Sequence, residues 1–96
     1  MIKASEARDN IKKFEIEQYN KIKTMVEEAL EVISTEIEFH SKNGLNTAEF
    51  VPYDASRFPS YRSVQIASEI FERILKDNGY EIITNDRANN ILKIKW

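Results

Sequence analysis

The chain has 96 residues, of which 42% are hydrophobic and 31% charged, and its formal net charge is −2. This length predicts a single domain spanning residues 1–96. The absence of cysteine excludes disulfides and thiol catalysis, and the small negative charge makes nucleic acid an unfavoured partner. Charged residues interrupt every apolar run well before the ~20 residues that a membrane span needs. We therefore expect neither membrane contact nor a signal peptide, and predict a cytoplasmic protein.

The first predicted element is a helix over residues 4–42, with Ser5 as its N-cap and Asn43-Gly44 as its stop. Apolar side chains spaced three and four residues apart define one face of this helix. The stripe slips by one position partway along: it comprises first Ala4, Ala7, Ile11 and Phe14, then Tyr19, Ile22, Val26, Ala29, Ile33 and Ile37. The alternative is a kink near Tyr19–Asn20, where the stripe slips, which would give a monomeric, hairpin-like arrangement.

This helix is long for so short a chain. Roughly 38 helical residues span about 57 Å, whereas a compact domain of this size has a radius of gyration of ~13 Å. A straight helix must extend beyond its own globule, and its apolar stripe then needs another surface. Residues 1–23 carry six basic and four acidic side chains, while residues 27–38 carry five acids and no base. Antiparallel pairing of two first helices would lay the mildly basic half of one along the acidic half of the other. We therefore predict a homo-oligomer that pairs in this way.

The remainder of the chain, residues 45–96, predicts a β-α-β-β unit. Its elements in chain order are a strand at 47–53, a helix at 60–78, and strands at 80–84 and 91–96. The polar run at 85–90 favours a hairpin, which makes the last two strands antiparallel. The simplest three-stranded mixed or antiparallel sheet has the order 1-3-2, with the second helix packed on one face. The fold class predicted is thus α+β.

Catalytic chemistry has few candidate groups in this sequence. His40 is the single histidine, and there is no cysteine, so a zinc site within one chain is not expected. Two glycines cannot build a glycine-rich phosphate loop, and no serine lies in a nucleophile-elbow motif. We predict a protein that is not an enzyme and needs no cofactor or metal.

The segment from Tyr53 to Ser63 joins the first predicted strand to the second helix and holds three aromatic residues, two arginines and three serines. Aromatic rings stack on bases, arginines bind phosphate oxygens, and N–H groups at a helix start attract anions. These residue types predict a nucleotide or phosphate pocket. The candidate ligand-binding residues are Tyr53, Ser56, Arg57, Phe58, Ser60, Tyr61, Arg62 and Ser63, with Arg87 from the hairpin and His40 and Lys42 from the first helix. The alternative is that the aromatic rings are core residues under a loop and the arginines are surface charges.

Both ends of the chain resemble small accessory proteins of tailed bacteriophages and prophages. The residues that carry the resemblance are Ala4-Ser5-Glu6-Ala7-Arg8, which open a long charged helix, and the closing strands Gly79-Tyr80-Glu81-Ile82 and Asn90-Ile91-Leu92-Lys93-Ile94-Lys95-Trp96. The resemblance implies a viral origin and an action on a bacterial host. Some phage proteins of this size are oligomeric sponges that sequester cyclic nucleotide signals of bacterial immunity without cleaving them.

Two functions are compatible with these observations. The leading hypothesis is a non-enzymatic, homo-oligomeric phage protein that captures a small anionic nucleotide, such as a cyclic dinucleotide, and so antagonises bacterial anti-phage immunity. The alternative is a protein-interaction module. Its first helix would dock on a host protein or on the virion, with the acidic residues 27–38 meeting a basic patch.

Overall fold

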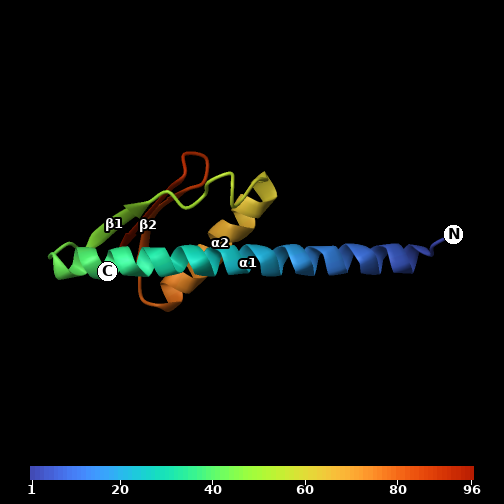
Figure 1. The fold of residues 1–96 in the computed structure, drawn as a ribbon, viewed down its shortest axis with the longest axis horizontal. Coiled ribbons are helices and arrows are strands. Elements are labelled where there is room, and N and C mark those ends of the chain that lie inside the picture. The colour runs from blue at the N-terminus through green and yellow to red at the C-terminus, as the bar shows by residue number, and fades with distance from the viewer.

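The computed structural model describes residues 1–96 and contains one long helix. Helix α1 (Ala4–Lys42) is unbroken over 39 residues and runs along the longest dimension of the molecule, 64 Å. Figure 1 shows it as a straight rod. The alternative prediction of a kink near Tyr19–Asn20 is therefore wrong: the slip shifts the line of the apolar stripe around the rod without ending the helix.

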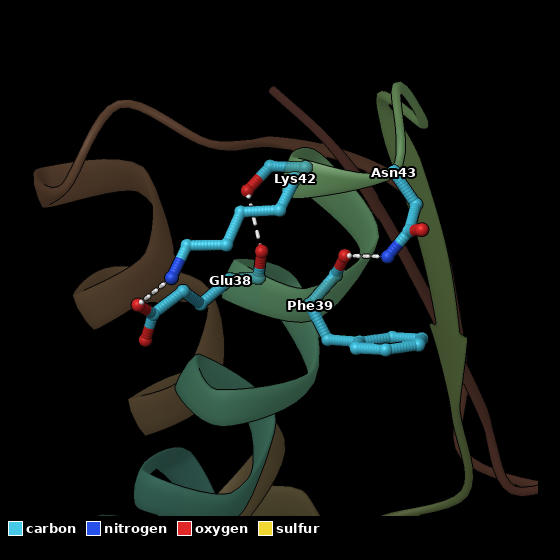
Figure 2. Close-up of polar contacts among 5 residues, drawn as sticks. Glu38, Phe39, Lys42 and Asn43 are labelled. Atoms are coloured by element: carbon cyan, nitrogen blue, oxygen red, sulfur yellow. Dashed lines mark hydrogen bonds and ion pairs between the residues drawn. The ribbon is translucent and has the colours of Figure 1, made fainter.

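The two ends of α1 differ in how they are capped. Lys3 occupies the N-cap position without a side-chain hydrogen bond, and Ser5 lies inside the first turn, so the prediction of Ser5 as the cap is wrong. The C-terminal stop lies where the sequence predicts it: Asn43 Nδ2 donates to the Phe39 carbonyl at 2.7 Å (Figure 2), and Gly44 adopts a φ of +81°. The positive φ explains why glycine follows the helix here.

The β-α-β-β unit follows the predicted order and topology. Its elements are β1 (Thr47–Phe50), α2 (Tyr61–Asp77), β2 (Glu81–Asp86) and β3 (Ile91–Lys95). The sheet order is β1-β3-β2, and β3 pairs antiparallel with both neighbours. The predicted α+β class and strand order are thus confirmed, with an antiparallel sheet. The first strand is shorter than predicted, because Pro52 cannot donate a ladder hydrogen bond and the chain leaves the sheet after Phe50.

The hydrophobic core lies between the sheet and the two helices. Its 15 buried residues are Ile22, Val26, Ala29, Ile33, Ile37, Ala48, Phe50, Tyr53, Phe58, Ala67, Ile70, Phe71, Leu75, Leu92 and Ile94. The contribution of α1 begins at Ile22, so only the C-terminal half of this helix belongs to the core. No helix of the chain has both the length and the apolar character required to cross a membrane.

Candidate docking site on the first helix

The N-terminal half of α1 extends away from the rest of the molecule (Figure 1). Every residue from 1 to 21 is exposed, and we call this segment the overhang. Ile11 is 58% exposed, Phe14 61% and Ile16 60%. Since Ile11 and Phe14 belong to the stripe that becomes core from Ile22 onward, the overhang continues a core-forming face beyond the reach of its own globule.

Tyr19 lies at the base of the overhang, where α1 meets α2. The Arg73 guanidinium donates a hydrogen bond of 3.4 Å to the Tyr19 hydroxyl, which joins the two helices on their outer side. Tyr19 is 37% exposed, between the exposed Phe14 and the buried Ile22. The burial of α1 therefore rises over about two helical turns.

A groove runs between the overhang and the first half of α2, and we call it the α1/α2 groove. Its volume is about 950 Å³. The residues that line it are Ile11, Lys12, Phe14, Glu15, Ile16, Gln18, Tyr19 and Ile22 from α1, with Ser60, Arg62, Ser63, Ile66 and Glu69 from the start of α2. An apolar floor with both acidic and basic side chains along it suits an amphipathic protein segment rather than a small polyanion.

The charges of the overhang are not engaged within the chain. The ion pairs of the structure are Lys42–Glu38 at 2.8 Å (Figure 2) and Arg57–Asp54 at 3.8 Å, and neither involves the overhang. The hydrogen bond from Lys42 lowers the pKa of the Glu38 carboxyl, so Glu38 keeps its negative charge at neutral pH. Arg8 and Glu15 are thus available to an external partner.

Two predicted ligand residues, Tyr61 and Arg87, come together in a separate depression. It has a volume of about 560 Å³ and lies between the first turn of α2 and the β2–β3 hairpin. Asp86 also lines it. Hydrogen bonds from Asn89 lower the pKa of the Asp86 carboxyl, so a negative charge stays beside Arg87. The depression thus offers an exposed ring and one guanidinium, with an acid next to them.

Tyr53 and Phe58 are core residues, so the prediction that they stack on a ligand base is wrong. Phe58 is 2% exposed, and the Tyr53 ring packs edge-on against Phe71 with centroids 5.8 Å apart. The Tyr53 hydroxyl donates to the Asn85 side chain, and its backbone N–H donates to Asn90 Oδ1 at 2.6 Å. Burial raises the pKa of Tyr53. The aromatic residues therefore anchor the loop to the core, which is the alternative interpretation of this segment.

The predicted serines serve local structure. Ser60 caps α2: its hydroxyl accepts from the Ser63 backbone N–H at 3.0 Å, and the Ser63 hydroxyl accepts from the Ser60 N–H in return. Ser56 donates to Asp54 Oδ1, which lowers the pKa of the Asp54 carboxyl. These hydroxyls already have partners, so a ligand would have to compete for them.

The predicted arginines are dispersed rather than convergent. Arg57 lies beside Asp54, Arg62 faces the α1/α2 groove, and Arg87 lines the separate depression. His40 and Lys42 lie at the C-terminal end of α1, on the opposite side of the globule from the start of α2 (Figure 1). Within one chain, the prediction that His40 and Lys42 close the loop pocket is therefore wrong.

The groove also contains residues that sequence reasoning missed. Ile16, Ile66 and Glu69 carried no functional prediction, because each lies off the main stripe of its helix. Only the crossing of α1 and α2 brings them together. The 3–4 spacing was the available signal, and it identifies Ile11, Phe14, Tyr19 and Ile22 among the groove residues but none from α2.

Comparison with models of protein families, with curated proteins and with solved structures finds no match. No cluster of three or more histidine, cysteine, aspartate or glutamate side chains is arranged to hold a metal ion.

Proposed function

We propose that this protein acts by binding another protein chain, with the overhang and the α1/α2 groove as its docking site. The observation that carries the proposal is the run of exposed residues 1–21, whose apolar side chains continue a core-forming stripe. Most of the stability of a helix in a protein comes from tertiary packing of its apolar face, so a partner surface would supply the packing that the globule does not. The proposal places this activity in the cytoplasm of a host cell.

Burial of the overhang would release substantial free energy. A phenylalanine buries roughly 150–250 Å² when fully enclosed. Phe14 is 61% exposed, so a partner can still remove roughly 90–150 Å² of its surface from water. At about 25 cal/mol per Å² this corresponds to about 2–4 kcal/mol before the entropy of association is subtracted. Phe14 is therefore the expected hot spot of the interface.

A photo-crosslinking experiment tests the docking site directly. The photoreactive amino acid benzoylphenylalanine is placed at Phe14 in the full chain, and the cells that express it are irradiated. The matched control carries the same amino acid at Phe39, which lies on the same helix and is 66% exposed. We expect a discrete covalent adduct from position 14 and little from position 39. Equal labelling from both positions, or none from either, would refute the docking site.

A second candidate function is the capture of a small anionic nucleotide, favoured by the juxtaposition of Tyr61 and Arg87. Tyr61 is 77% exposed and can stack on a base, while Arg87 can bind a phosphate. Asp86 opposes an anion at the same place. Calorimetry against a panel of cyclic nucleotides tests this candidate, with Arg87→Ala as the variant that should abolish the heat of binding. Absence of heat with every nucleotide would end it, and with it the predicted antagonism of bacterial immunity.

A further inference from the structure

We infer that the chain seated on the overhang is a second copy of this protein, and that the two overhangs pair antiparallel through residues 4–21. This inference rests on the proposed function and names the partner of the same docking site.

The seam consists of side chains with alternating steps of three and four residues, which is the a/d pattern of a coiled coil. Its members are Ala4, Ala7, Ile11, Phe14 and Gln18. All five are exposed in the single chain. Ala4 and Ala7 are small enough to let two helices approach closely near the ends of the seam. Ile11 and Phe14 supply the bulk in its centre, so the pattern suits a short two-helix interface.

The flanking charges select the antiparallel direction. Arg8 and Glu15 each follow a seam residue directly, so both occupy the e position of the repeat. In an antiparallel pair with Ile11 packed against Phe14 of the second copy, Arg8 lies beside Glu15 of that copy, and the two-fold axis repeats the contact. A parallel pair would instead place Lys3 beside Arg8 of the second copy, which is repulsive. Charge complementarity therefore favours antiparallel pairing.

The same register brings the second copy to the α1/α2 groove. When Ile11 faces Phe14 of the other chain, residues 1–3 of that chain extend past Lys21 to the base of the overhang. Ile2 is 54% exposed in the single chain and would enter the groove near Arg62 and Ile66. Each copy thus contributes its N-terminal residues to the groove of the other, and the interface closes after two chains.

The interface is short, which sets the expected affinity. Eighteen residues of helix, from 4 to 21, span about 27 Å. An interface of that length falls at the small end of specific protein contacts, where dissociation constants on the order of micromolar are common. The dimer should therefore form and dissociate across an experimentally accessible concentration range.

Sedimentation equilibrium of the full chain, from about 1 to 500 µM, tests the inference. We expect a monomer–dimer equilibrium for the unmodified protein. Phe14→Glu should raise the dissociation constant by roughly 100-fold or more, because a hot-spot side chain is lost from both copies. Phe39→Glu is the matched control and should leave the equilibrium unchanged. A chain that stays monomeric at the highest concentration, or equal effects of both variants, would overturn the inference.

A charge exchange tests the direction and register. Arg8→Glu and Glu15→Arg should each weaken the dimer about five- to tenfold, because two attractive contacts become repulsive. The double variant should recover most of the original affinity. Failure of the double variant to recover would overturn the antiparallel register.

The outcomes separate this inference from the proposed function. A monomeric protein whose position 14 crosslinks to a different protein would refute self-association and leave the docking site standing. A monomeric protein without any crosslink from position 14 would refute both.

Discussion

The two halves of α1 belong to one continuous helix and share the same kind of apolar spacing, yet they have opposite environments. Ile33 is 4% exposed and packs in the core, whereas Ile11 is 58% exposed. The difference arises because α2 and β1 pack against the C-terminal half of α1, while the overhang extends past the end of the globule (Figure 1). An amphipathic pattern therefore indicates that a helix face needs burial, and the surrounding fold decides whether the same chain provides it.

The largest expected difference is between the losses of stability caused by truncating two isoleucines of this one helix. Ile33→Ala should lower the free energy of unfolding by about 2–5 kcal/mol, because it leaves a cavity in the core. Ile11→Ala should change it by less than about 0.5 kcal/mol in dilute protein, because the side chain is exposed. Urea denaturation at low micromolar protein measures both. Comparable losses from the two substitutions would show that the overhang is already packed in the monomer.

Hydrogen exchange sharpens the contrast along the backbone. Amides in the first half of α1, up to residue 18, should exchange quickly in dilute protein, because that part of the helix has no tertiary packing. Amides around Val26 and Ala29 should exchange only by global unfolding, since both side chains are buried. Raising the protein concentration should slow exchange in the overhang alone. Concentration-independent protection of the overhang would mean that its helix does not depend on a partner.

A smaller difference in stability is expected from removing the serine hydroxyl near the start of each helix. Ser60→Ala should cost about 1 kcal/mol, because the Ser60 hydroxyl caps α2 by accepting from the Ser63 N–H. Ser5→Ala should have almost no effect, since Ser5 lies within the first turn of α1 and the N-cap residue is Lys3, which makes no side-chain cap. Thermal or urea unfolding of the two variants gives the difference. A cost at Ser5 similar to that at Ser60 would contradict the capping found here.

Much of the fold was predictable from local patterns. The bounds of α1, the antiparallel hairpin and the strand order β1-β3-β2 follow from periodicity, from turn residues and from the limited ways of connecting three strands. The errors lie where two conformations have the same local signature. A serine near a helix start can be the cap or a residue of the first turn, as Ser5 is, and a slipped stripe is compatible with a kinked or a straight rod.

The candidate site was predictable only in part. The length of the first predicted helix, compared with the size of a compact domain, correctly predicted a helix that extends beyond the globule with its apolar stripe exposed. The loop from Tyr53 to Ser63 has a composition typical of ligand-binding segments, yet Tyr53 and Phe58 are buried because the loop crosses back over the core and needs anchors there. Composition does not distinguish an aromatic residue that anchors a loop from one that binds a ligand, because both uses require the same flat apolar ring.

The sequence by itself determined the elements and their pairing, because spacing, turn chemistry and chain connectivity act over short distances. Only the tertiary structure decided how far along α1 the globule reaches, and hence which apolar residues become core and which remain available to a partner. It also decided that Ile66 and Glu69 share a groove with Phe14. Both outcomes depend on where α2 crosses α1, which is set by packing between residues distant in the chain.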